Sequence, residues 1–271
     1  MSTVSFEPSA GGTFGAGLRS ASVTKQLMWA NGIAFLVTFL LVRFLPTVGG
    51  PTWGWLRLDP ATWYSGLPAV WQLWTYGFLH DLGSPFHLLF NLLALYFFGS
   101  MLEAQIGARR FAWQYFAALA FGALVHLGLV PWIGQNPVVG ASGAVLYCVI
   151  ACATLQPNAQ VLFFFVPMPL KVMALILVAL DLFGVLSGGT ARTASDVHLA
   201  GAALGFASVK LGWVHFEPGA WWNARREQSA VQAQATDAQR LDQLLDRIHR
   251  EGIHSLNRRD KDFLARMSKR D

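Results

Sequence analysis

Six long, nearly uncharged apolar runs dominate this sequence and restrict what it can fold into. They cover residues 27–45, 86–106, 111–133, 138–155, 169–188 and 197–214. Each approaches the ~20 apolar residues that a helix needs to cross the hydrocarbon core of a bilayer. Only 13% of the 271 residues are charged, about half the ~25% that is usual for soluble domains. The runs therefore predict an all-α polytopic membrane protein, a bundle of six transmembrane helices.

The same composition argues against disordered, collagen-like and nucleic-acid-binding classes, so we expect no nucleic-acid partner. The chain has two cysteines, Cys148 and Cys152, four residues apart within one apolar run. Two cysteines cannot build a disulfide framework or a cysteine zinc site. We expect them to serve packing, and we expect the chain to use no metal and no cofactor.

Basic residues in the short connections predict the orientation in the membrane. Lysine and arginine gather at one set of helix ends: Arg19, Lys25, Arg109, Arg110, Lys171 and Lys210. The opposite ends hold fewer: Arg43, Arg57 and Arg192. Because cytoplasmic loops carry the excess of basic residues, we expect a multi-pass protein of the cell (inner) membrane with both termini in the cytoplasm.

The segments outside the runs predict three domains. Residues 1–25 are expected to form a disordered cytoplasmic N-terminus, 26–214 the membrane domain, and 215–271 a cytoplasmic helical tail. In the tail, Leu241, Leu244, Leu245 and Ile248 repeat at helical spacing, and Asn257 resembles a second helix start. We therefore expect two short amphipathic helices there. They could dock on the membrane surface, on a partner or on each other.

The connection 46–85 is long and rich in aromatic residues, with Trp53, Trp55, Trp63, Trp71 and Trp74. Such residues prefer the membrane–water interface, so the connection is expected at the outer boundary of the bilayer. A compact aromatic core within it is an equally good interpretation, and both can hold.

Four polar residues stand out because such side chains are expensive inside a membrane and usually functional. They are His87, Asn91, Ser142 and His198. The charge pattern gives the second, fourth and sixth helices one direction, and each of these residues falls in the first turns of its helix. At a rise of 1.5 Å per residue, all four lie at one depth, several ångströms below the outer boundary.

Hydrolysis by a serine nucleophile is the chemistry that the residues at this depth could perform. A serine hydroxyl needs a base within ~3 Å, whereas helix axes ordinarily lie 8–10 Å apart. Small residues permit a closer approach: Gly140 to Ala144 surround Ser142, and Gly201 and Gly205 follow His198 in a G-x-x-x-G pattern. Either motif alone fits plain helix packing, but together they favour catalysis.

A developing oxyanion would need hydrogen-bond donors. The backbone N–H of Ser142, the amide of Asn91 and the imidazole of His87 could supply them, since residues four apart share a helix face. The alternative for His87 and Asn91 is a hydrogen bond between helices that holds the bundle together.

Taken jointly, these motifs resemble the rhomboid family of intramembrane serine proteases over roughly residues 55–214. The carrying segments are Trp71 to Tyr76, His80, His87 to Asn91 with Gly99, Glu103 and Gly107, Gly140 to Gly143, and His198 to Gly205. The tail is similar to an extension of bacterial members. The resemblance implies a serine endopeptidase with Ser142 as nucleophile, His198 as base, and oxyanion contacts from His87, Asn91 and the Ser142 backbone. It also implies single-span membrane proteins as substrates, cleaved near the outer face after a small residue, with lipids as the other partners.

Two positions depart from the family pattern. Gln72 stands where an arginine is common, which we expect to loosen the anchoring of the 46–85 connection. Leu146 stands where an aromatic residue often stacks on the histidine, with Tyr147 beside it.

The other intramembrane polar residues receive structural roles. We expect Asp196 to cap the sixth helix with Thr193 or Ser195, and Glu103 to hydrogen-bond within the bundle. His80 is expected to structure the outer connection, and His126 has no partner that the sequence suggests. Asp181 fits a place at a water-filled cavity or a hydrogen-bonded packing role better than a direct catalytic one.

Other protease classes lack their motifs here: there is no H-E-x-x-H, no G-x-G-D and no G-x-S-x-G. A transporter is a weak alternative, because no inverted repeat is visible. The serious alternative is a catalytically silent rhomboid-like scaffold that binds membrane client proteins. Such relatives usually lack the serine or the histidine, and this chain has both.

Overall fold

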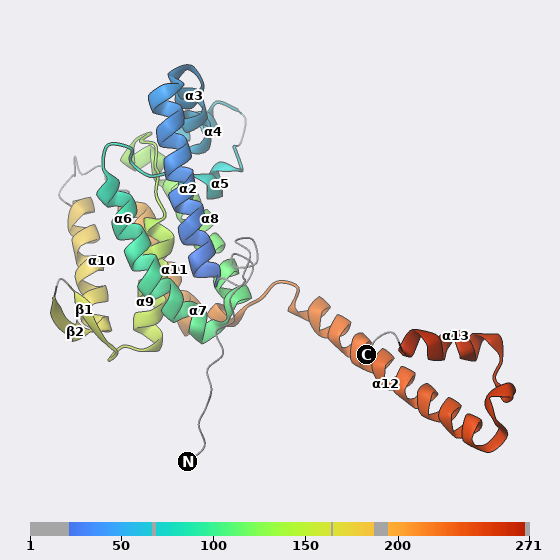
Figure 1. Cartoon of the computed structure of the whole chain (residues 1–271). Coiled ribbons are helices and arrows are strands. Elements are labelled where there is room, and N and C mark those ends of the chain that lie inside the picture. The colour runs from blue at the N-terminus through green and yellow to red at the C-terminus, as the bar shows by residue number, and fades with distance from the viewer. Residues whose placement is uncertain (1–21, 67–68, 164, 187–194, 269–271) are drawn as a thin grey trace, which may run out of the picture. The chain divides into compact units, whose positions relative to one another are not determined.

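The structure is a computed structural model, and it describes residues 22–66, 69–163, 165–186 and 195–268. The chain divides into two compact units, Met1–Phe216 and Glu217–Asp271 (Figure 1). The first unit is a helical bundle and the second a pair of helices, so the predicted all-α class is confirmed. Most of the expected N-terminal segment 1–25 lies outside the described residues, and the first described helix begins at Val23.

Each of the six expected apolar runs coincides with helical structure in the described residues. The helices are α2 (Val23–Phe44), α6 (Pro85–Ala94) continued by α7 (Ser100–Ile106), α8 (Ala108–Ile133), α9 (Ser142–Leu155), α10 (Leu170–Leu186) and α11 (Ser195–Lys210). Within the described ranges, three helical segments are long and apolar enough to cross a membrane: Val23–Phe44, Pro85–Ile106 and Ala108–Ile133. The chain is therefore a membrane protein, while crossing by the shorter helices remains a prediction.

A π-helical turn, Leu95–Gly99, joins α6 to α7, and the Glu103 carboxylate in α7 then caps α2. Its two oxygens accept the backbone N–H groups of Val23 and Thr24 at 2.8 and 2.9 Å, and the Thr24 hydroxyl at 2.7 Å. A helix start leaves such N–H groups without intrahelical partners. Glu103 thus has the bundle role that the sequence predicts.

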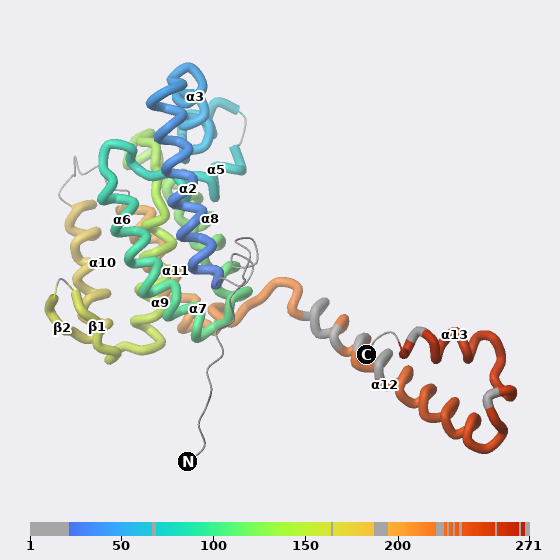
Figure 2. The backbone as a smooth tube through the Cα atoms, viewed as in Figure 1, coloured from blue at the N-terminus to red at the C-terminus, as the bar shows by residue number. Residues whose placement is uncertain are grey.

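Helix α11 packs mainly against α9 and α8, and α10 packs against α11 and α9 (Figure 2). Between α9 and α10 the chain forms an antiparallel hairpin of β1 (Gln160–Phe163) and β2 (Val166–Pro169), which the sequence pattern does not predict. The hairpin follows the C-terminal end of α9. Ser142 is at the other end of that helix.

The aromatic connection folds into α3 (Pro46–Leu56), α4 (Pro60–Tyr64), α5 (Gln72–Thr75) and the 3-10 turn η1 (Tyr76–Phe78). The rings of Trp55 and Trp71 stack with centroids 4.3 Å apart, but Trp55 is 58% exposed, so the compact aromatic core stays a prediction. The backbones of Leu58 and Val138 exchange hydrogen bonds of 3.1 and 2.9 Å. The connection is therefore tied to the strand-like segment that leads into Ser142.

The second unit consists of α12 (Ala220–Glu251), the turn η4 (Ile253–Ser255) and α13 (Arg258–Met267). Its core is built around the buried side chains of Leu244, Leu256 and Phe263, so the two helices dock on each other. Asn257 Oδ1 accepts the backbone N–H of Asp260 at 2.9 Å, which confirms the predicted helix start. The expectation of two short helices is wrong for the first, because α12 has 32 residues.

Candidate active site

Ser142 is the first residue of α9, and the chain reaches it through Gly140 at φ +123°. A Cβ at Gly140 would lie 2.9 Å from His87 Cε1 and 3.6 Å from Ser142 Oγ. Only glycine fits this backbone conformation and this space. The absence of a side chain at residue 140 therefore lets His87 and Ser142 approach each other across it.

His198 lies in the first turn of α11, and its Nε2 is 2.6 Å from Ser142 Oγ. Small residues make this possible, as the sequence predicts. A Cβ at Gly201 would lie only 2.0 Å from the carbonyl oxygen of Gly143, so the backbones of α9 and α11 are in direct contact one turn below the pair. The hydroxyl and the imidazole thus sit in the geometry that a serine nucleophile and its base need.

Asp181 in α10 adds a third side chain to this pair. Its Oδ1 lies 2.8 Å from His198 Nδ1, and the two side chains are 16% and 19% exposed. The sequence pattern favoured a cavity or packing role for Asp181 and did not predict this contact with His198. The one available signal was a carboxylate in a run that is otherwise apolar from Val172 to Leu186.

His87 and Asn91 share one face of α6, as their spacing requires. Asn91 is 7% exposed, and its Nδ2 donates to the backbone carbonyl of His87 at 2.8 Å. Among the described residues, neither side chain forms a hydrogen bond with another helix. The alternative of an interhelical hydrogen bond therefore finds no support in this geometry.

His80, in the loop before α6, is fully buried, and its ring lies edge-on to His87 with centroids 5.2 Å apart. Burial, and secondarily the neighbouring His87, lower the pKa of His80 to about 4. The imidazole is therefore neutral at physiological pH. The predicted structural role of His80 agrees with this placement behind His87.

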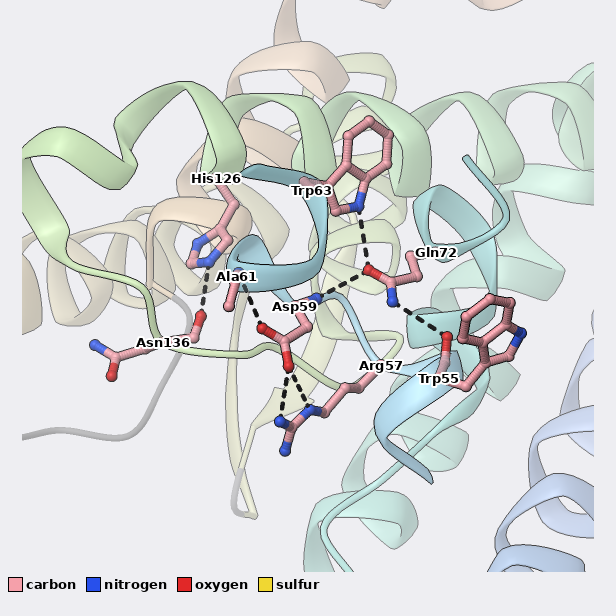
Figure 3. A network of polar contacts seen from close by, with 8 residues as sticks. All are labelled: Trp55, Arg57, Asp59, Ala61, Trp63, Gln72, His126 and Asn136. Carbon is pink, nitrogen blue, oxygen red and sulfur yellow. Dashed lines mark hydrogen bonds and ion pairs between the residues drawn. The ribbon is translucent and has the colours of Figure 1, made fainter. Parts of the chain in front are cut away.

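A second histidine–aspartate pair links α8 to α11. His126 Nδ1 lies 2.6 Å from Asp196 Oδ2. On its other side, His126 Nε2 lies 2.9 Å from the carbonyl oxygen of Asn136, the contact that Figure 3 shows. Asp196 thus contacts His126, for which the sequence suggested no partner. The expected capping of the helix by Asp196 with Thr193 or Ser195 stays a prediction, and Thr193 lies outside the described residues. Both ring nitrogens of His126 face oxygen atoms of Asp196 and Asn136, and neither faces a hydroxyl that it could deprotonate.

Gln72 makes contacts that tie parts of the outer connection together, whereas the expected loosening relative to arginine stays a prediction. The Gln72 side chain is fully buried, and Figure 3 shows it at the centre of a polar network. Gln72 Oε1 accepts the Asp59 backbone N–H at 3.0 Å and Trp63 Nε1–H at 3.1 Å, and Nε2 donates to the Trp55 carbonyl at 3.1 Å. A glutamine side chain can accept and donate hydrogen bonds at once, because its amide carries one acceptor oxygen and an NH₂ group with two donor hydrogens.

Leu146 is buried in the bundle core, and its neighbour Tyr147 is engaged elsewhere. The Tyr147 hydroxyl donates to Gln114 Oε1 at 3.0 Å and lies 3.0 Å from Ser208 Oγ. In the described part of the chain, no group of three or more His, Cys, Asp or Glu side chains could hold a metal ion.

Comparison with known proteins adds family information. The family model of the rhomboid domain matches residues 68–215, and a family of unknown function matches residues 228–270. A mitochondrial RHOMBOID-like protein 12 of Arabidopsis thaliana is 27% identical over 162 residues, which are 54% of this chain and 46% of that protein. The mitochondrial Rhomboid protein 1 of Saccharomyces cerevisiae is 38% identical over 88 residues, 31% of this chain and 25% of that protein. The chain thus matches less than half the length of these relatives.

Proposed function

This chain belongs to the rhomboid family, and we propose that it is an intramembrane serine endopeptidase that uses Ser142 and His198. The observation that carries the proposal is the 2.6 Å distance between Ser142 Oγ and His198 Nε2. A hydroxyl that shares its proton with an imidazole is the activated nucleophile of acyl transfer. The proposed substrates are single-span membrane proteins.

In the first half of the reaction, Ser142 Oγ attacks the carbonyl carbon of the scissile peptide while its proton passes to His198 Nε2. The tetrahedral intermediate collapses as the C–N bond breaks, and His198 returns the proton to the leaving amine. In the second half, His198 takes a proton from a water molecule whose oxygen attacks the acyl-enzyme ester. The C–Oγ bond then breaks, and the proton goes back to Ser142 Oγ.

The oxyanion of both intermediates needs donors that are already in place. The backbone N–H of Ser142 is one, since the first N–H groups of a helix have no intrahelical partner. Asn91 is a second: its amide has two hydrogens, one on the His87 carbonyl and the other for the substrate oxygen. The His87 imidazole, beside Gly140, is the third.

The enzyme is proposed to reside in the cell membrane with both termini in the cytoplasm and Ser142 near the outer face. The asymmetry of lysine and arginine supports this orientation. Reporter fusions at residue 271 and within 131–137 are expected to report opposite sides of the membrane. The same side for both would contradict the proposed topology.

The test of activity is co-expression with a panel of single-span reporter proteins. Wild-type protein is expected to cleave at least one reporter, and Ser142→Ala and His198→Ala are each expected to abolish the cleavage without loss of the folded bundle. Because the two residues act as one unit, the double variant should be no worse than either single one.

A serine-reactive fluorophosphonate probe separates an enzyme from a silent scaffold. Labelling of Ser142 is expected in wild type and should fall to background in His198→Ala. Wild-type protein that binds reporters but neither cleaves them nor reacts with the probe would favour the scaffold function. Unchanged labelling of His198→Ala would contradict the role of His198 as base.

A further inference from the structure

We propose that Asp181 is a positioning residue that orients His198, so that this chain works with a serine–histidine–aspartate triad. The inference rests on the proposed function and adds a residue to it. Three helices contribute one side chain each: Asp181 from α10, His198 from α11 and Ser142 from α9. The contacts run in one line, 2.8 Å from Asp181 Oδ1 to His198 Nδ1 and 2.6 Å from His198 Nε2 to Ser142 Oγ.

The carboxylate determines which nitrogen of His198 carries the hydrogen. An ionised carboxylate can only accept, so Nδ1 of a neutral His198 donates to Asp181 and the lone pair of Nε2 faces Ser142 Oγ. With the other tautomer, Nε2–H would point at the hydroxyl and could not take its proton. When Ser142 attacks and Nε2 gains that proton, the negative charge of Asp181 stabilises the imidazolium that forms.

The placement of Asp181 supports this role over a packing role. The buried residues of α10 are Leu170, Met173 and Ala174, at the end of the helix away from Asp181. Next to Asp181, Leu180 and Leu182 are 61% and 47% exposed, as expected for side chains that face lipid. A carboxylate in such a helix is expensive unless it has a partner, and its partner here is the base of the proposed reaction.

The His126–Asp196 pair provides an internal comparison. It has the same chemistry and a similar distance, 2.6 Å, and Asp196 lies two residues before His198 in the same helix. However, the second nitrogen of His126 is 2.9 Å from the carbonyl oxygen of Asn136 and faces no nucleophile. The His198–Asp181 pair is therefore placed to take the proton of Ser142, whereas the His126–Asp196 pair joins α8 to α11.

The two aspartates allow a matched experiment on the full-length protein. Asp181→Asn and Asp196→Asn make the same chemical change in two histidine–aspartate pairs of one bundle. For each variant, thermal stability in detergent, kcat and KM for a cleaved single-span reporter, and the rate of fluorophosphonate labelling are measured per folded protein. Asp181→Asn is expected to lower kcat and the labelling rate by ~10²-fold or more, with KM nearly unchanged. Asp196→Asn is expected to lower stability and leave kcat per folded molecule close to wild type.

A second pair of variants covers the case in which Asp181→Asn does not fold. Asp181→Glu and Asp181→Gln have nearly the same size and differ in charge, so Glu should retain more kcat than Gln.

Several results would overturn the triad. These are an Asp181→Asn protein with wild-type kcat, an equal loss of kcat in Asp196→Asn, or equal activity of the Glu and Gln variants. If wild-type protein neither cleaves nor reacts with the probe, the proposed function itself fails and the triad fails with it. A wild type that cleaves beside an unaffected Asp181→Asn overturns the triad alone.

Discussion

Gly201→Ala is expected to abolish most of the activity, although residue 201 is not part of the candidate active site. A Cβ at residue 201 would lie 2.0 Å from the carbonyl oxygen of Gly143, whereas real Cβ atoms stay beyond 3.0 Å. Because the added methyl group would clash with backbone atoms, no side-chain rotation can relieve the clash, and α11 must move away from α9 by about 1 Å. Gly143 follows Ser142 in the chain, and Gly201 lies one turn after His198, so the displacement acts directly on the catalytic pair.

The size of the effect follows from the length of the affected bond. Ser142 Oγ and His198 Nε2 are 2.6 Å apart, and a retreat of about 1 Å takes the pair beyond hydrogen-bonding distance. Misplacement of this size costs about 10²-fold in rate. Forcing a methyl group into a packed contact also destabilises a fold by about 1–3 kcal/mol, although the higher helix propensity of alanine offsets part of this loss.

The assay compares Gly201→Ala with Gly128→Ala in α8, where an added methyl group would meet nothing within 4 Å. Melting temperature in detergent, reporter cleavage and probe labelling per folded protein are measured for both. Gly128→Ala is expected to behave as wild type. A Gly201→Ala protein with wild-type labelling and melting temperature would refute the reasoning, because it would mean that α9 and α11 do not touch at this level.

Three further predictions concern other parts of the chain. Asn91→Ala is expected to lower kcat by ~10²–10³-fold with little change in KM, and a folded variant with normal kcat would exclude the oxyanion role. The free energy of unfolding in detergent should fall as the pH drops from 6.5 towards 4, by up to about 3 kcal/mol at 1.36 kcal/mol per pH unit. The reason is that His80 takes up a proton in the unfolded chain at a higher pH than in the folded protein, where burial lowers its pKa to about 4. His80→Phe should therefore make the melting temperature depend less on pH in this range. Phe263→Ala should open the α12–α13 pair to proteolysis near Gly252, because the loss of a buried phenylalanine costs about 3–5 kcal/mol, while labelling of Ser142 stays unchanged.

Local patterns were sufficient for the parts of the site that depend on single helices. Ser142 could be predicted because small residues surround it at a helix start, and His198 because glycines follow on its own face. The helix start at Asn257 is of the same kind. In each case the signal and the structure that it predicts lie within a few residues of one another.

Contacts that depend on how a helix is rotated about its axis could not be predicted. Apart from Lys171 and Asp181, α10 is apolar on all sides, so its sequence shows no face that must point inward. Whether Asp181 meets His198 or the lipid is decided by the packing of α10 on α9 and α11. The His126–Asp196 pair joins residues 70 positions apart and is equally invisible in a single sequence.

Gln72 shows how a departure from a family pattern can be compensated locally, and Gln72→Arg tests this directly. The amide oxygen of Gln72 accepts two hydrogens, from the Asp59 backbone and the Trp63 indole, whereas a guanidinium only donates. Arginine would leave both buried donors unpaired, at about 1–3 kcal/mol each, beside an Asp59 carboxylate that already pairs with Arg57 at 2.7 Å. Gln72→Arg is therefore expected to melt well below wild type and no higher than Gln72→Met, which matches glutamine in volume but makes none of its hydrogen bonds. An arginine variant that melts above wild type would show instead that the glutamine loosens the outer connection.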